Sequence, residues 1–309
     1  MQLLGTIPQQ LVNGVTLGAI YAIVALGYSL VYGVLRLFNF AHGDLFMLGA
    51  YFGITLLSFA RGTSSWAVGA GVLLVLGYLV ATLGAGLAGM AVEKFSYRPV
   101  AKATRLAQLI SVLGASLVIE NAVMLVWGKR NIYFPSVVPQ HVYTLGGVSV
   151  TNIQLYIVGL TFVLLAGLYY FINKTTTGLA LRATSENPVA ASLMGIDVRS
   201  SIALTFFLGP ALGGAAGLMY SQYYGIGTYI MGWLVGIKGF VATVIGGIGS
   251  IAGAVVGGFL LGLAENVGAG FLPVLTGGAF GPEYRDIFAF TVLILVLIIR
   301  PSGIMGERG

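Results

Sequence analysis

The 309-residue chain is 58% hydrophobic and only 8% charged, whereas an ordinary soluble domain carries roughly a quarter charged residues. This composition excludes a soluble globular domain and indicates a polytopic membrane protein. The net charge of +6 does not point to nucleic acid, because the placement of Lys and Arg in a membrane protein reports orientation first. The absence of cysteine excludes disulfides and thiolate metal sites.

Long uncharged runs predict an all-α fold. Only helices and closed barrels satisfy every backbone group in lipid, and no alternating barrel pattern is present. A helix needs roughly 20 apolar residues to span the bilayer, so we expect a single transmembrane domain over residues 1–309 with about 8–10 membrane helices, some of them broken or re-entrant. The first run lacks a basic region before it and is therefore expected to be a retained span. The clearest expected helices are 11–35, 44–60, 66–92, 106–127, 151–172, 201–224, 239–263 and 285–299.

The polar break "RLFNFAHGDLFMLGAY" (36–51) follows the first run. His42 and Asp44 point about 200° apart on a helix, so they do not form a metal pair, and no catalytic constellation accompanies them. Asp44 caps a helix that begins after Gly43, or Asn39 caps an earlier start. Alternatively, Asn39, His42 and Asp44 line a substrate path. The residues leave these choices open.

Basic residues predict the sidedness of the loops. Segments 93–105 and 174–200 carry several Lys and Arg residues and should be cytoplasmic, whereas the turn-rich segment 128–150 should be external. The basic tail should also be cytoplasmic. An even number of crossings must therefore follow the loop 174–200, but only three apolar segments do, so one of them must be split or re-entrant. The expected place is 200–237, which is uncharged and is interrupted by Pro210 and by "YYGIGTYIMGW" (223–233).

Polar residues inside apolar runs are candidates for a pathway, since each is costly in hydrocarbon and tends to face the bundle interior. For Lys238 and Glu265 the alternative is an interfacial position with snorkelling. Without several buried acids in register, a proton-coupled carrier is poorly supported. The candidates outside the 36–51 stretch are Glu120, Asn121, Lys238, Glu265 and Asn266.

Glycines recur at four-residue spacing at Gly249, Gly253 and Gly257, which predicts a helix face that packs closely against a neighbouring helix. Gly-broken segments occur in both halves of the chain, which raises the hypothesis of an inverted repeat. The identity between the halves is faint.

The polar segment 174–200 differs from the other loops. Pro188 suits the first turn of a helix and Gly195 suits its end, so we expect a short helix here that is too polar to span a membrane. A short exposed helix buries little of itself, which makes docking on a partner protein its natural purpose. The alternative is an ordinary solvated loop.

Several long motifs resemble the LivH family, the H-type permease subunits of bacterial high-affinity branched-chain amino acid ABC importers. They are "NGVTLGAIYAIVALGYSLVYGVL" (13–35), "NFAHGD" (39–44), "EKFSYRPV" (93–100), "ALTF" (203–206), "GGIGSIAGAVVGG" (246–258) and "RPSGIMG" (300–306). The resemblance runs nearly end to end, with the motifs in the family's order.

The resemblance implies a subunit of an ATP-driven importer in the bacterial inner membrane that translocates leucine, isoleucine and valine. The implied partners, besides the lipid bilayer, are an M-type permease, two cytoplasmic ATPases that bind ATP and Mg, and an external solute-binding protein. It also implies that 174–200 holds an ATPase-coupling helix, although Val189 stands where the family has Glu. The residues assigned to this coupling loop are Glu186, Asn187, Pro188, Ala190, Ala191 and Gly195.

This chain lacks a G-x-x-x-x-G-K-[ST] loop, so we expect it neither to bind ATP nor to act as an enzyme. We expect no cofactor, metal or nucleic acid on it. The alternatives are a permease for other amino acids, urea or short amides, or a self-sufficient channel or secondary carrier. A membrane enzyme is the remotest alternative.

Overall fold

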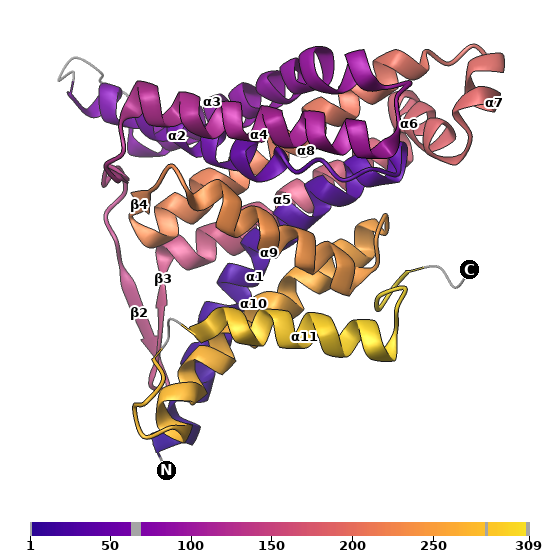
Figure 1. Cartoon of the computed structure of the whole chain (residues 1–309). Coiled ribbons are helices and arrows are strands. Elements are labelled where there is room, and N and C mark those ends of the chain that lie inside the picture. Colours follow the sequence, from indigo (N-terminus) through magenta and orange to yellow (C-terminus); the bar gives the residue numbers. More distant parts are fainter. Residues whose placement is uncertain (1, 63–68, 282–283, 307–309) are drawn as a thin grey trace. The chain divides into compact units, whose positions relative to one another are not determined.

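The computed structural model describes residues 2–62, 69–281 and 284–306. The described residues are mostly helical (Figure 1), as the composition predicts. In chain order the helices are α1 (Gln2–Leu35), α2 (His42–Gly62), α3 (Ala70–Val92), α4 (Arg105–Trp127), α5 (Asn152–Lys174), α6 (Thr176–Glu186), α7 (Pro188–Leu193), α8 (Val198–Tyr224), α9 (Met231–Gly246), α10 (Ile251–Leu275) and α11 (Arg285–Ile299). The short strands are β1 (Ile132–Tyr133), β2 (Val142–Leu145), β3 (Val148–Thr151) and β4 (Ile226–Gly227).

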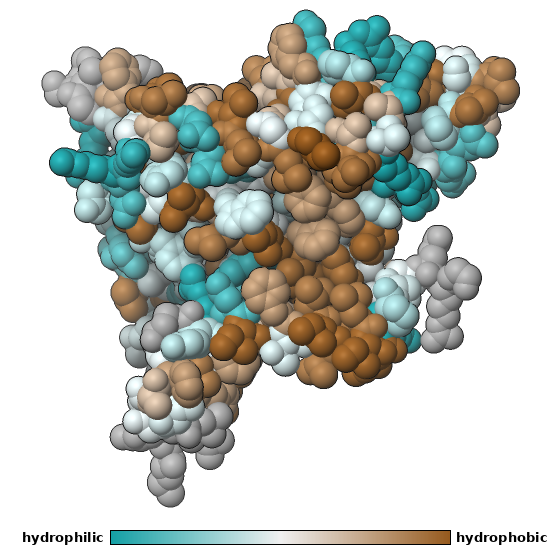
Figure 2. All heavy atoms as spheres, viewed as in Figure 1, coloured by the Kyte–Doolittle hydropathy of each residue, from teal (hydrophilic) through white to brown (hydrophobic). Residues whose placement is uncertain are grey.

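Seven helices among the described residues are long and apolar enough to cross a membrane, namely α1, α2, α3, α4, α5, α8 and α10. Helices α9 and α11 have 16 and 15 residues, so at about 1.5 Å per residue each falls short of the roughly 30 Å hydrocarbon core. Figure 2 shows hydrophobic spheres over α11, where Ile294, Ile298 and Ile299 are mostly exposed, as expected of a helix in contact with lipid.

The chain forms two compact units. Unit 1 comprises Met1–Leu26, Pro139–Phe162 and Lys238–Gly309, and unit 2 comprises Gly27–Val138 and Val163–Ile237. Helices α1, α5 and α9 each contribute residues to both units.

In unit 2, α2, α3 and α8 pack closely together. Glycines allow this approach: a Cβ on Gly217 of α8 would strike the carbonyl of Phe46 in α2, and one on Gly214 would strike that of Ala81 in α3. A cluster of buried apolar side chains then fills the space around these helices. It includes Val31, Leu37, Ala41, Leu45, Val92, Tyr97, Val112 and Phe206.

The prediction that Pro210 interrupts the chain is wrong, because α8 continues through it from Val198 to Tyr224. Proline removes the hydrogen bond to the carbonyl four residues earlier, which here is that of Phe206. Pro210 and this carbonyl lie directly against Gly89 of α3, where the missing Cβ leaves room for them. The second expected interruption of segment 200–237, at "YYGIGTYIMGW", is confirmed, because α8 ends at Tyr224 and Gly225 adopts φ +74.

In unit 1, α10 packs along α1 through Gly258 and Gly262, whose added Cβ atoms would meet the backbone of Ala22 and Gly18. The prediction of one helix over 239–263 is wrong, because α9 ends at Gly246 and α10 begins at Ile251. Gly247 and Gly249 adopt φ +114 and +84, a region that glycine enters without steric cost.

Gly249 therefore lies in a turn and does not share a helix face with Gly253 and Gly257. These two do lie on α10, where they meet the backbone of α9 at Gly246 and Ala242. The tail completes the turn: Ile304 N donates to Ile245 O at 2.9 Å and Met305 N to Gly246 O at 2.8 Å. It thereby satisfies carbonyls that the end of α9 leaves open.

The segment expected as an irregular external loop contains strands. β2 and β3 form an antiparallel hairpin in unit 1, closed at Gly146 and Gly147. In unit 2, β1 pairs with β4, so Ile132 lies opposite Gly227. The turn-rich composition predicted an exposed loop and did not indicate this strand pairing.

Candidate functional site

Unit 1 contains a network of charged residues built from four helices. Lys238 of α9 places its Nζ atom 3.0 Å from Oε1 of Glu265 on α10 and 2.7 Å from Oδ1 of Asp286 on α11. The hydroxyl of Tyr21 on α1 donates to Oε2 of Glu265 at 3.0 Å. The Lys238 ammonium also lies 5.8 Å from the centre of the Tyr21 ring.

Most of this network is buried in the fold, where an isolated charge is energetically unfavourable. The Glu265 side chain is 0% exposed and that of Lys238 is 9% exposed, whereas Asp286 is 45% exposed. A carboxylate or an ammonium alone at such a position would be strongly unfavourable, so each requires the other. The ion pair thus holds α9 and α10 together, while Asp286 contributes a partly solvated contact.

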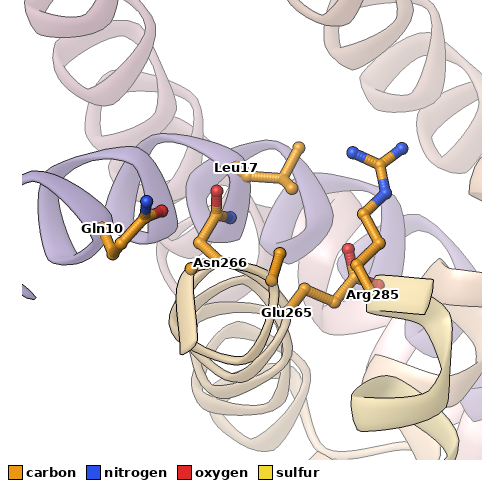
Figure 3. Close-up of a pocket in the computed structure, with 7 residues that line it drawn as sticks. Gln10, Leu17, Glu265, Asn266 and Arg285 are labelled. Atoms are coloured by element: carbon orange, nitrogen blue, oxygen red, sulfur yellow. The ribbon is translucent and has the colours of Figure 1, made fainter. Parts of the chain in front are cut away.

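A cavity of about 230 Å³ adjoins the network. Figure 3 shows Gln10 and Asn266 toward one end of the row of lining side chains and Arg285 at the other, with Glu265 between Asn266 and Arg285. Leu17, Ala269 and Gly270 complete the lining. The cavity is therefore a space within unit 1 that presents both signs of charge.

The sequence identified Lys238, Glu265 and Asn266 singly but did not show that Lys238 and Glu265 form a pair. Both side chains are buried in the fold and form a pair with each other. Sequence reasoning missed Gln10, Tyr21, Arg285 and Asp286. The one available signal was that opposite charges in apolar segments tend to pair, which would have related Lys238 to Glu265 and Asp286.

Unit 2 contains the polar break of the opening motif. Asn39 accepts from the amide N–H of Ala41 through its side chain, at 3.2 Å, and from that of His42 through its carbonyl, at 3.0 Å. Helix α2 begins at His42, so of the two capping alternatives the geometry matches Asn39. The His42 ring is fully buried, lies edge-on to Tyr28 with ring centroids 4.6 Å apart, and fits beside Gly27 and Gly213.

Asp44 lies in the first turn of α2, near the positive end of the helix dipole. Its carboxylate does not cap the helix and instead accepts a hydrogen bond from the hydroxyl of Ser116 on α4. Glu120, one turn after Ser116, lies near enough to Asp44 for the two negative charges to repel. Asn121 is exposed and its side-chain amide donates to the carbonyl of Leu117, so it is not part of this group.

The "EKFSYRPV" motif forms a π-helical turn over Glu93–Tyr97. Arg98 closes it with two hydrogen bonds to Glu93, from Nε at 3.0 Å and from a terminal nitrogen at 2.6 Å. Such a two-pronged pair fixes geometry as well as charge. The motif therefore has a structural role at the end of α3.

The segment after α5 contains two helices, α6 and α7, whereas the sequence predicted only the second. Asn187 caps α7: its side-chain oxygen accepts from the amides of Val189 and Ala190, both at 3.0 Å. Gly195 follows with φ +86 and ends the helix. Ala191 is buried, whereas Glu186, Pro188 and Ala190 are exposed. The expected short helix over this segment is thus present.

Asp197 caps the start of α8. The Ser200 hydroxyl donates to one carboxylate oxygen at 2.6 Å, and the amides of Ser200 and Arg199 donate to the other. These hydrogen bonds, that from the hydroxyl first, lower the pKa of Asp197 below its usual value. The turn between α7 and α8 is therefore held by a charged cap.

Within the described ranges, no three His, Cys, Asp or Glu side chains lie close enough together to hold a metal ion. The polar group around Glu265 in unit 1 contains a carboxylate paired with Lys238, and the group around Asp44 in unit 2 contains a carboxylate that accepts from the Ser116 hydroxyl. Such arrangements suit a membrane protein that binds or conducts polar solutes.

Comparison with known proteins identifies the family of the chain. The family model described as "Branched-chain amino acid transport system / permease component" matches residues 10–297. The high-affinity branched-chain amino acid transport system permease protein BraD of Pseudomonas aeruginosa is 39% identical over 306 residues, which cover 97% of this chain and 95% of BraD. The permease protein LivH of Escherichia coli is 39% identical over 305 residues, with the same coverage.

Among solved structures, PsaBC from Streptococcus pneumoniae in complex with Fab matches with a TM-score of 0.52 and 13% sequence identity, covering 97% of this chain and 96% of that one. This match concerns the fold alone. The family model and the two permeases cover nearly the whole chain at substantial identity. This multi-pass membrane protein therefore belongs to the family of permease components of branched-chain amino acid transport systems.

Proposed function

We propose that this chain, as a single permease domain over residues 1–309, is the membrane subunit of an ATP-driven importer of leucine, isoleucine and valine. The relatives BraD and LivH are named permease proteins of high-affinity branched-chain amino acid transport systems. In the proposed assembly an external binding protein delivers the amino acid, and an M-type permease completes the pathway. Two ATPase subunits hold ATP and Mg and perform the hydrolysis, and the complex lies in the bacterial inner membrane.

The observation that carries this proposal is the exposed apolar surface of α7. Val189, Leu193 and Met194 are 70%, 83% and 83% exposed, although the helix has only six residues. A helix this short is not stable by itself and relies on its Asn187 cap and on Ala191, which packs inward. Apolar side chains held outward on a capped helix are suited to docking in a partner's groove.

We infer that α7 is the point of contact with an ATPase subunit, and that Glu186 supplies an acidic group at its edge. ATP-driven closure of the ATPase pair would move α7 and, through the turn capped by Asp197, the start of α8. Helix α8 packs along α2 and α3 in the same unit, so a displacement of its start would reach the polar group around Asp44. Asn39, His42, Asp44 and Glu120 are the candidate pathway residues there.

The test uses the complete complex in proteoliposomes, with the binding protein outside and ATP inside. The double variant Leu193→Glu/Met194→Glu should lose ATP turnover stimulated by the loaded binding protein. In the proposed complex both side chains are buried against the ATPase, and each such apolar contact is worth about 1.5–3 kcal/mol. Thr177→Glu is the matched control. It adds a charge at an exposed position in the first turn of α6, where the helix dipole favours it.

Normal coupled turnover in the double variant would contradict the role of α7. Leucine movement down its gradient by the purified chain alone would favour the alternative of a channel or secondary carrier. Import of another amino acid, urea or a short amide in place of branched-chain amino acids would overturn the substrate assignment and keep the transport class.

A further inference from the structure

The cavity beside Glu265 has an ordered distribution of hydrogen-bonding groups. The side-chain amide of Asn266 donates to the carbonyl of Gly262 at 2.9 Å, which uses one of its two N–H donors and leaves its oxygen as an acceptor. Glu265 adds carboxylate oxygens. Arg285, at the other end of the row in Figure 3, adds a guanidinium, which can only donate.

The carboxylate of Glu265 retains acceptor capacity. A carboxylate offers about four acceptor positions. Oε2 accepts from Lys238 at 3.1 Å and from Tyr21 at 3.0 Å, whereas Oε1 lies 3.0 Å from the Lys238 Nζ atom and accepts no hydrogen bond from the described residues. Across the network the charges of Lys238, Arg285, Glu265 and Asp286 sum to zero, so the cavity favours neither a pure anion nor a pure cation. A ligand with one positive and one negative group at short separation matches this lining.

We propose that this cavity binds the zwitterionic end of a free amino acid, with Arg285 facing the α-carboxylate, and Glu265 and the Asn266 oxygen facing the α-ammonium. A guanidinium forms two parallel hydrogen bonds with a carboxylate, which gives both affinity and orientation. An ammonium has three donors and fits between two adjacent acceptors on α10. The proposal rests on the proposed function and names a substrate site within it.

The rest of the lining suits an aliphatic side chain. Leu17 and Ala269 are apolar, whereas the space at Gly270 is taken by Gln10. A Cβ on Gly270 would lie 2.7–2.9 Å from three side-chain atoms of Gln10, so Gln10 lies directly across the glycine. The volume of about 230 Å³ is that of a site for a small solute, below the roughly 300–1,000 Å³ of pockets for drug-sized ligands.

The experiment measures direct binding to the complete complex in nanodiscs, without the binding protein. Three probes share one branched carbon skeleton: leucine, isopentylamine, which lacks the carboxylate, and 4-methylpentanoate, which lacks the ammonium. On wild-type protein, leucine should bind at least tenfold more tightly than either analogue, because leucine contacts both ends of the cavity and each analogue contacts only one.

Two variants then separate the two ends of the ligand. Arg285→Met should weaken leucine at least tenfold and leave isopentylamine unchanged, whereas Asn266→Leu should weaken leucine and isopentylamine and leave 4-methylpentanoate unchanged. The matched control is Arg130→Met, the same substitution at an exposed position in unit 2. Thermal midpoints of all variants within a few degrees of wild type show that folding is intact. Glu265 is left unaltered because Lys238 depends on it.

The proposal is overturned if leucine binds no better than the two analogues, or if both variants bind leucine as wild type does. ATP-driven import of leucine by the wild-type complex is measured separately. Import together with unchanged binding in both variants rejects this site and leaves the proposed function standing. Failure of import together with the expected binding pattern rejects the proposed function and leaves a zwitterion site.

Discussion

Replacing Lys238 with Met removes one charge from the buried network and leaves the other. Met has a similar length and is apolar, so the change isolates the loss of the ammonium from the loss of volume. Glu265, with a side chain that is 0% exposed, would then keep only the Tyr21 hydroxyl as its described partner in the network. The buried carboxylate must either remain charged without its counterion or take up a proton.

Breaking a buried pair from one side costs about 3–5 kcal/mol. The lower end applies here, because the cavity beside Glu265 gives water a place to solvate the carboxylate and Tyr21 still donates to it. We therefore expect Lys238→Met to lower the free energy of unfolding by about 3 kcal/mol. Loss of the contact to Asp286 adds little, because an ion pair with a half-exposed carboxylate is worth at most about 1 kcal/mol.

The assay compares thermal midpoints of the purified protein for three variants. The double variant Lys238→Met/Glu265→Gln should recover most of the loss, because no uncompensated charge remains buried. Asp286→Asn is the matched control, removing the exposed partner of the same lysine, and should stay close to wild type. A single variant as stable as wild type, or a double variant less stable than the single one, would refute the reasoning.

Three further predictions concern other contacts. Ser116→Ala should lower stability by about 1–3 kcal/mol, because it removes the hydroxyl that donates to the buried Asp44 carboxylate; an unchanged melting temperature would show that water replaces it. Gly262→Leu should prevent α10 from packing on Gly18 of α1 and abolish stable expression, while Gly159→Leu, at a glycine with open space around it, should be tolerated; equal expression of both would contradict the packing. The lowered pKa of Asp197 means that its cap stabilises the fold fully above about pH 4 and is lost as the pH falls through the lowered pKa. The difference in melting temperature between wild type and Asp197→Asn should therefore shrink on acidification, and a constant difference would count against the charged cap.

The membrane class and most helices followed from the sequence because their cause is local. An uncharged run of sufficient length must form a helix in lipid, and the expected helices at 44–60, 106–127, 151–172 and 285–299 correspond closely to α2, α4, α5 and α11. The short helix α7 was likewise marked by Pro188 and Gly195, residues whose backbone preferences act at their own positions.

The positions at which helices end were harder to predict, because they depend on contacts with residues distant in the sequence. Pro210 suggests a break when considered alone, yet Gly89 of a different helix accommodates it. Gly249 fits a helix-packing repeat by spacing, yet the chain turns there, and the tail satisfies the carbonyls at the end of α9. Neither outcome is encoded within a few residues of the position concerned.

The sequence by itself determined that this protein is an all-helical membrane protein of a permease family, since hydrophobic run lengths and long motifs are properties of the chain alone. Only the tertiary structure decided which polar residues act together. Tyr21, Lys238, Glu265 and Asp286 lie far apart in the sequence, on four helices. They are brought together because each buried charge in a membrane protein needs a partner and close-packed glycines allow the helices to supply one.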